Sequence, residues 1–273
     1  MRLRPRSHSR LVRSCLAGLA GSIALASLVA GTATGGPAHL DLASNPSMQT
    51  LPGRIGAPAK VLQMVTITSP DWGSTTGTLK AWQRPPGGAW ASVHGPLPVV
   101  LGYHGWVVAD QRVQSSGTSP AGRFGLPAAF GLLADPGTAL EYRHVDGNDW
   151  WPYEPRDPAT YNIYQTHKDP HSHWRPTYAE HLASFTTQYA YAIVVGFNLP
   201  KGVHYSPARR QRVATVPSDT KIGGGIFLHV RGAGDTAGCI AMNRADVQWL
   251  LSWLRPGRRP QVVMGPYDYV LTL

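Results

Sequence analysis

The apolar residues of this chain come in short runs that end at glycine or proline, and this pattern limits the fold. The 273 residues include 30 glycines and 24 prolines. Turn-forming residues at this density interrupt long helices but suit short strands joined by turns. We expect strands at 61–67 and 98–102, and a hairpin over 79–93 around Pro-Pro-Gly-Gly. The sequence therefore predicts a mainly β fold with few short helices.

Three later runs add strands to this prediction. Residues 189–196 are almost continuously apolar, which favours a strand buried on both faces. Residues 225–228 form a short apolar run that leads directly to His229, and residues 261–265 form another. We therefore expect His229 to be presented by the end of a strand.

Other segments differ from this strand pattern. Residues 110–125 and 200–220 are polar and rich in turn residues, so we expect surface loops there. Residues 141–180 carry many tryptophans and tyrosines, and their prolines break any long helix. We expect this aromatic segment to be an insertion that packs over a cleft or forms its wall.

One helix is predicted near the C-terminus. Asn243 is a good N-cap, and Asp246 lies in the first turn, beside the positive end of the helix dipole. Pro256-Gly257 ends the helix. Its apolar stripe has helical spacing and comprises Val247, Leu250, Leu251 and Leu254.

The first 36 residues have the pattern of a secretory signal peptide. Arginines precede an apolar, small-residue run at 16–30, and Gly31-Thr32-Ala33 offers a small-x-small cleavage site. We expect a flexible lead-in over 37–60 and one domain over 61–273. The protein would then be exported to the cell-wall side of the cytoplasmic membrane. An uncleaved segment would be its only membrane contact, although the run is shorter than the ~20 residues of a spanning helix.

The charge of the chain suits an anionic envelope. The formal net charge is +10, and residues 1–36 hold five arginines and no acid, so their removal leaves about +5. A moderately basic exported protein fits an acidic partner, although the same charge also serves solubility alone. No basic stripe is interleaved with aromatic residues, so nucleic acid is not expected as a partner.

Removal of the leader takes Cys15 away and leaves Cys239 as the only cysteine. A single cysteine cannot form an internal disulfide, so it is either a small buried hydrophobe or a reactive thiol. Ten residues before it stands His229, and the loop between them contains three glycines that let the backbone fold back. An imidazole beside the thiol can take its proton and so activate it for attack on a carbonyl.

The loop also offers groups that stabilise the charge formed in such an attack. Backbone N–H groups of Gly238 and Cys239 are candidates for an oxyanion hole, because glycine permits a close approach. Thr236 is placed to orient the loop or to donate its hydroxyl. The sequence therefore predicts a cysteine–histidine pair with loop support from Thr236 and Gly238.

The stretch Thr236-Ala237-Gly238-Cys239-Ile240 resembles the signature of L,D-transpeptidases, the YkuD-type catalytic domain. The segments 118–124, 101–105 and 179–182 are also similar to this family, in a secreted branch with a short His–Cys loop. The resemblance covers about residues 61–265.

The resemblance implies a β-sandwich-like fold with a catalytic cleft and a helix after the cysteine. It also implies that Cys239 forms an acyl-enzyme with His229 as the base and no cofactor. The family's donor is a peptidoglycan stem tetrapeptide, whose acyl group passes to a second stem to give a 3→3 cross-link. Such a protein serves peptidoglycan biosynthesis and cell shape, and carbapenem-type β-lactams inhibit it by acylating the thiol.

Some residues depart from the family pattern. The family often has a basic residue where this chain has Ala237, an arginine in place of Ala241, and a glycine in place of Val230. These differences affect the substrate contacts rather than the Cys–His pair. Arg231 would replace one of the lost charges, or it is simply solvated. Further candidates for substrate binding are Tyr191 and Asn198, which either face the cleft or belong to the core.

Several alternatives remain. The same Cys–His site would serve an L,D-carboxypeptidase or another cell-wall hydrolase, in which water takes the acyl group. A non-catalytic wall-binding module would keep the fold without the chemistry. His167, His171 and His173 would suit a metal-dependent peptidase, but no His-Glu-x-x-His motif accompanies them, so no metal is expected.

Overall fold

The structure of the protein is a computed structural model, which describes residues 49–273. The predicted signal peptide and the first part of the lead-in lie outside the described residues, so both stay predictions. Within residues 49–273 no helix has the length and apolar character needed to span a membrane.

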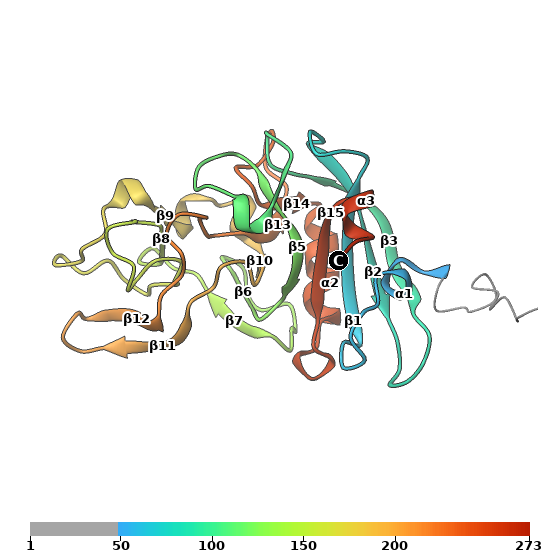
Figure 1. Ribbon diagram of the computed structural model, residues 1–273. Coiled ribbons are helices and arrows are strands. Elements are labelled where there is room, and N and C mark those ends of the chain that lie inside the picture. Colours follow the sequence, from blue (N-terminus) through green and yellow to red (C-terminus); the bar gives the residue numbers. More distant parts are fainter. Residues whose placement is uncertain (1–48) are drawn as a thin grey trace, which may run out of the picture. The chain divides into compact units, whose positions relative to one another are not determined.

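The fold is mainly β, as predicted, with 36% strand and 15% helix. The main sheet contains β1 (Gln63–Ser69), β2 (Thr76–Gln83), β3 (Ala91–Val100), β4 (Trp106–Val108), β5 (Ser119–Gly125), β6 (Ala128–Gly131), β7 (Glu141–His144), β10 (Ala192–Val194), β13 (Phe227–Val230), β14 (Ile240–Met242) and β15 (Gln261–Pro266). Their order in the described part of the chain is β4-β5-β15-β1-β2-β3-β14-β13-β10-β6-β7 (Figure 1).

Smaller elements complete the fold. Two separate two-stranded sheets are formed by β8 (Trp150–Pro152) with β9 (Ala179–His181) and by β11 (Lys201–Ser206) with β12 (Gln211–Val216). Figure 1 shows both at one end of the domain, with β1, β2 and β3 at the other. The helices are α1 (Leu51–Arg54), α2 (Arg244–Trp253) and α3 (Tyr267–Val270).

The main sheet bends so that its two halves share one hydrophobic core. Leu79 of β2 and Val262 of β15 belong to the same buried cluster as Ile193 of β10 and Leu228 of β13. Leu250 of α2 is fully buried in this cluster as well. Since apolar side chains from both halves meet around one helix, the architecture is that of a β-sandwich.

Helix α2 forms where the sequence predicts it. Asn243 occupies the N-cap position, although its side chain makes no cap hydrogen bond, and Asp246 lies in the first turn. The four residues of the apolar stripe are completely buried, which anchors α2 in the core.

The aromatic segment 141–180 packs as a second cluster. Trp151, Tyr161 and Tyr164 are buried against Phe130 of β6 and Phe227 of β13. This segment therefore covers the face of β13 opposite to the main core, and it provides a wall next to the strand that carries His229.

Four predicted boundaries differ from the structure. The expected strand at 98–102 is the end of the longer strand β3, and the expected buried strand at 189–196 is limited to the three residues of β10. The second half of the expected loop 110–125 is β5, buried between β4 and β15. The expected loop 200–220 contains the β11–β12 hairpin, in which β11 is mostly exposed and β12 buries Gln211 and Val213.

The second half of the expected flexible lead-in is folded. Helix α1 is followed by Ile55, which is only 4% exposed. The guanidinium of Arg84 donates from Nε to the carbonyl of Val61 at 2.9 Å and from Nη2 to the carbonyl of Pro58 at 2.6 Å. These bonds tie the backbone at Pro58 and Val61 to the domain, because an arginine side chain can satisfy several backbone carbonyls at once.

Candidate active site

The pairing of two strands brings the candidate cysteine and histidine together. Strand β13 runs parallel to β14, with Leu228 opposite Ile240. Cys239 immediately precedes β14, which places it opposite Phe227, and the N–H of Phe227 lies 3.4 Å from Sγ of Cys239. Alternate residues of a strand share a face, so His229 points to the same side as Phe227 and the thiol.

Cys239 lies where two pockets meet. The smaller pocket has a volume of about 160 Å³ and is lined by both Cys239 and His229, together with the loop 232–237. The larger pocket, of about 710 Å³, is lined by Cys239 with Arg112 and Tyr153. Glu180 lines both pockets. The half-buried Cys239 therefore borders both pockets.

The thiol is held in its neutral form. Sγ of Cys239 donates to the carbonyl of Gly225 at 3.3 Å. Burial raises the pKa of the thiol to about 12, and the charge of the Glu180 carboxyl adds to this rise. The Phe227 N–H and the Arg112 guanidinium act in the opposite direction, because both favour the thiolate.

His229 is also neutral, and its proton can be assigned. Nδ1 lies 2.8 Å from the carbonyl of Val230, which can only accept, so Nδ1 carries the hydrogen and Nε2 keeps a lone pair. The side chain is 6% exposed, and burial lowers its pKa below the ordinary 6.5. The ring of Tyr189 contacts it edge-on, with centroids 5.8 Å apart. The imidazole is therefore fixed in the state of a base.

The direct imidazole–thiol hydrogen bond expected from the sequence is not formed among the described residues. The proton of Cys239 is directed to Gly225 instead. His229 and Cys239 nevertheless line the same small pocket. Catalytic hydrogen bonds often tighten only when substrate is bound.

Thr236 supports the loop that presents the thiol. Its hydroxyl accepts from the N–H of Gly238 at 3.1 Å and donates to the carbonyl of Cys239 at 2.6 Å. The N–H of Gly238 is thereby occupied, so the expected oxyanion role of this group is not available in the structure. Gly238 has a φ of +136°, and a β-carbon there would lie 2.6 Å from the carbonyl oxygen of Thr118.

Arg112 lies at the site although sequence reasoning missed it. It follows the short 3-10 helix η3 (Ala109–Gln111), in the segment expected to be a surface loop, yet it is only 3% exposed. Its Nε donates to the carbonyl of Thr118 at 2.9 Å, and its Nη1 donates to the carbonyl of Ile222 at 3.2 Å. Ile222 is 110 residues away in the sequence, so local pattern gives no signal for this burial.

Glu180 and two tyrosines form a second group that was missed. The hydroxyl of Tyr189 hydrogen-bonds to Oε2 of Glu180, and burial raises the pKa of this carboxyl. Tyr153 is 7% exposed, and its hydroxyl is directed to the same Glu180 carboxyl. The signal available in the sequence was an acidic residue, Glu180, within the aromatic segment. The short strand β9 of this segment brings Glu180 to both pockets.

Three other expected residues lie away from the thiol, since none of them lines either of its pockets. Arg231 is exposed to solvent. Tyr191 is 5% exposed and belongs to the main core. The amide of Asn198 is directed to loop backbone, donating to the carbonyls of Asp219 and Gly223.

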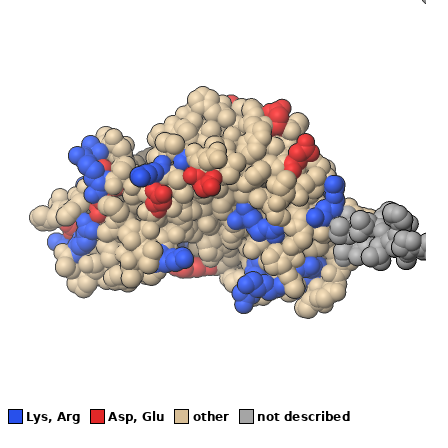
Figure 2. Space-filling model, viewed as in Figure 1, with Lys and Arg blue, Asp and Glu red and all other residues tan. Residues whose placement is uncertain are grey.

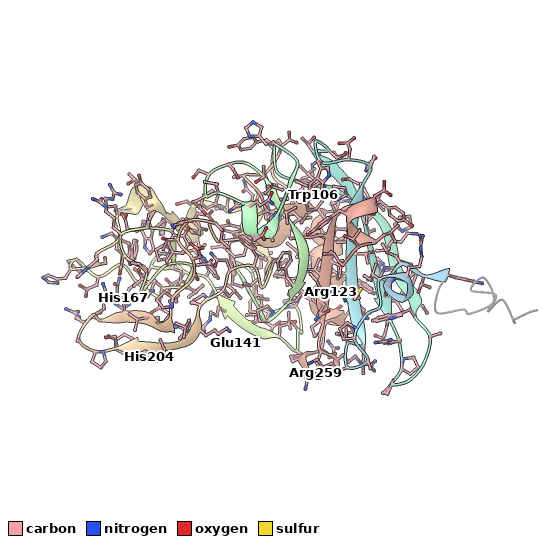
Figure 3. All side chains as sticks on the ribbon, in the orientation of Figure 1. Trp106, Arg123, Glu141, His167, His204 and Arg259 are labelled. Carbon is pink, nitrogen blue, oxygen red and sulfur yellow. The ribbon has the colours of Figure 1, made fainter. Side chains whose placement is uncertain are left out.

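Residues 167–173, which contain three histidines, form a loop on the outside of the domain, where Figure 3 labels His167. Nδ1 of His171 lies 3.2 Å from Oδ1 of Asp169. In the part of the chain that the structure describes, no three His, Cys, Asp or Glu side chains are grouped to hold a metal ion.

On the face shown in Figure 2, lysines and arginines stand in separate groups with acidic residues between them.

Comparison with known proteins gives one match. The family model described as YkuD, L,D-transpeptidase catalytic domain, matches residues 97–264. This range runs from β3 to β15 and includes both His229 and Cys239. No curated protein and no solved structure matches the chain.

Proposed function

Because the chain belongs to the YkuD family of L,D-transpeptidase catalytic domains, we propose that it is a peptidoglycan L,D-transpeptidase with Cys239 as nucleophile and His229 as base. The observation that carries the proposal is the parallel pairing of β13 with β14, which places a neutral thiol and a neutral imidazole in one pocket. A base whose pKa is lowered by burial is unprotonated at neutral pH and ready to accept a proton.

The acylation step begins with two neutral side chains. Nε2 of His229 takes the proton of Cys239 as Sγ attacks the carbonyl carbon of the bond to be cut, so no stable thiolate is needed. The carbonyl oxygen becomes an oxyanion, for which the N–H of Cys239 is the adjacent backbone donor. When this intermediate collapses, the C–N bond breaks, the imidazolium returns its proton to the leaving amine, and a thioester to Cys239 remains.

The second step transfers the acyl group. An amine of a second stem peptide attacks the thioester carbon, its surplus proton passes through His229, and the thiol of Cys239 is released. The stem tetrapeptide is the proposed donor, with loss of its terminal D-alanine and formation of a 3→3 cross-link. The two pockets that meet at the thiol support this assignment, because they offer separate room for donor and acceptor. If water replaces the amine, the same site is an L,D-carboxypeptidase.

The location of the reaction is part of the proposal. The predicted signal peptide would export the domain to the cell-wall side of the membrane, where its substrate lies. N-terminal sequencing of the secreted protein tests this, and we expect a new N-terminus near residue 36.

A product assay tests the proposed chemistry. Purified protein is incubated with a stem tetrapeptide, with and without an amine acceptor. The masses of the products are then measured by mass spectrometry. We expect a cross-linked product with the acceptor and D-alanine release in both cases, and a chelator should have no effect. Cys239→Ala and His229→Ala should each abolish turnover. Release of D-alanine without any cross-link would assign a carboxypeptidase.

A covalent probe identifies the nucleophile independently. Exposure to a carbapenem should add one inhibitor mass to the intact protein, and peptide mapping should place it on Cys239. The Cys239→Ala protein should remain unmodified. If the wild-type protein also remains unmodified and binds peptidoglycan without turnover, the chain is a non-catalytic wall-binding module.

A further inference from the structure

We infer that Arg112 is a catalytic residue of the proposed reaction, whose guanidinium stabilises the negative charge that develops on Sγ of Cys239 and then on the oxyanion. The inference rests on the proposed function, but its first test does not depend on turnover.

The first observation is that the charge of Arg112 is buried without an acidic partner. The side chain is 3% exposed, and none of the ion pairs in residues 49–273 includes it. Its two hydrogen bonds go to the neutral carbonyls of Thr118 and Ile222. A buried cation without a counter-charge is costly, and it attracts any anion that forms nearby.

The second observation is the position of the remaining nitrogen. Nη2 of Arg112 takes part in neither hydrogen bond, and a β-carbon on Gly238 would lie 2.9 Å from it. This nitrogen is therefore beside the backbone that leads into Cys239. Arg112 and Cys239 line the same larger pocket, and among residues 49–273 no other lysine or arginine lines either pocket at the thiol.

The third observation concerns the backbone donors that could serve an oxyanion at this site. Oxyanion holes commonly use two or more preorganised donors. The N–H of Gly238 is occupied by the hydroxyl of Thr236. Glu180 on the pocket wall disfavours negative charge on the thiol, whereas Arg112 favours it. The guanidinium of Arg112 lies beside Gly238. It supplies the hydrogen-bond donor and the positive charge that the Gly238 backbone does not supply.

Alkylation of the free thiol tests the charge effect. Rates of Cys239 modification by anionic iodoacetate and by neutral iodoacetamide are measured for the wild type and for Arg112→Met. A neighbouring cation favours the anionic reagent and the thiolate, so we expect the iodoacetate-to-iodoacetamide ratio to fall about tenfold in the variant. Arg231→Met, which removes an exposed arginine outside both pockets, should leave the ratio unchanged. An equal ratio for Arg112→Met and wild type overturns the inference, whatever the turnover assay gives.

Acylation kinetics test the contact with the oxyanion. We expect Arg112→Met to lower the acylation rate by about 10²-fold, as loss of an oxyanion donor does. The loss should be the same for tetrapeptides that end in a free carboxylate and in an amide. If it disappears with the amide, Arg112 binds the substrate carboxylate instead and the inference is overturned.

Thermal unfolding would reveal whether Arg112→Met fails to fold. A second variant tests the inference in that case. Arg112→Lys keeps the cation but cannot reach two carbonyls and the oxyanion together, because an ammonium lacks the guanidinium fork. We expect it to keep the alkylation ratio within about twofold while its acylation rate falls about tenfold or more. An unchanged acylation rate for this variant would rule out the guanidinium contact.

Discussion

The side-chain hydroxyl of Thr236 donates to the backbone carbonyl of Cys239 at 2.6 Å, three residues further along the chain. The same hydroxyl accepts from the N–H of Gly238 at 3.1 Å. One oxygen atom thus fixes the peptide unit before Gly238 and the peptide unit after Cys239, and the turn shape depends on it.

Replacement of that hydroxyl should loosen the turn. Thr236→Val keeps the shape of the side chain but leaves the N–H of Gly238 and the carbonyl of Cys239 unpaired, which costs about 2 kcal/mol. We expect a lower free energy of unfolding in urea and slower carbapenem acylation of Cys239. Thr236→Ser retains the hydroxyl and is the control. Equal acylation rates for the serine and valine variants would contradict this role.

The pH dependence of acylation should follow His229. Burial lowers its pKa below 6.5, so the imidazole is already neutral at pH 7, and the rate should stay constant above that pH and fall only at more acidic pH. Alkylation by iodoacetamide needs the thiolate, whose pKa is raised to about 12, so its rate should climb about tenfold per pH unit between 7 and 10. Parallel profiles for the two reactions would indicate a preformed thiolate instead.

The same histidine links stability to pH. A pKa that is lower in the folded than in the unfolded state means that the unfolded state binds the proton more tightly. The stabilisation is therefore complete above pH 6.5 and is lost as the pH falls from 6.5 through the lower pKa of the folded state. The melting temperature of the wild type should drop between pH 7 and 5 more than that of His229→Gln, as differential scanning calorimetry can show.

The sequence predicts those parts of the fold whose signals are local. The helix after Asn243 has a cap position, a stripe of four buried residues and a proline stop within one short segment. Strand β5 carries no such signal, because Ser119 and Gly122 are typical of a loop. Its burial comes from pairing with β15, where Gly122 lies opposite Met264, and these strands are far apart in the sequence.

The same distinction holds for the candidate site. His229 and Cys239 are ten residues apart, and the glycines between them make a return of the chain predictable. Arg112 is buried because the carbonyls of Thr118 and Ile222 accept its hydrogen bonds. Glu180 reaches the pockets through β9 of the aromatic segment. Such contacts depend on the tertiary fold, which neither composition nor periodicity reports.

Two glycines of the His–Cys loop offer a matched comparison. Gly238→Ala introduces a β-carbon 2.6 Å from the carbonyl of Thr118 at a φ of +136°, which combines strain with a clash. Gly234 has a φ of +79° with nothing within 4 Å, so Gly234→Ala adds only the strain of a left-handed residue, about 1 kcal/mol. We expect Gly238→Ala to destabilise by about 3 kcal/mol or more and to stop acylation. Equal urea midpoints for the two variants would contradict the contact.

The carboxyl of Glu180 should slow the reactivity of the free thiol. Its charge raises the pKa of Cys239, so Glu180→Gln should lower that pKa and speed iodoacetamide alkylation at pH 9. Glutamine also keeps an acceptor for the hydroxyl of Tyr189. Glu141→Gln changes an exposed carboxylate of β7 and is the control (Figure 3). A slower or unchanged rate for Glu180→Gln would show that its charge does not reach the sulfur.

Asn162 ties the aromatic segment to the backbone that accepts the thiol proton. Its Oδ1 accepts from Nε1 of Trp151 and from the N–H of Gly225, both at 2.8 Å, and its Nδ2 donates to the carbonyl of Asn198 at 2.7 Å. Asn162→Ala leaves three buried groups unpaired, so we expect a loss of about 3–5 kcal/mol in urea unfolding.

A second substitution at this position separates the hydrogen bonds from backbone strain. Asn162 has a φ of +60°, which glycine adopts more readily than alanine. Asn162→Gly should therefore be about 1 kcal/mol more stable than Asn162→Ala while both lack the amide. Because Gly225 is the acceptor of the Cys239 proton, both variants should also acylate more slowly with a carbapenem. If Asn162→Gly recovers the wild-type stability and rate, strain rather than the amide network governs this position.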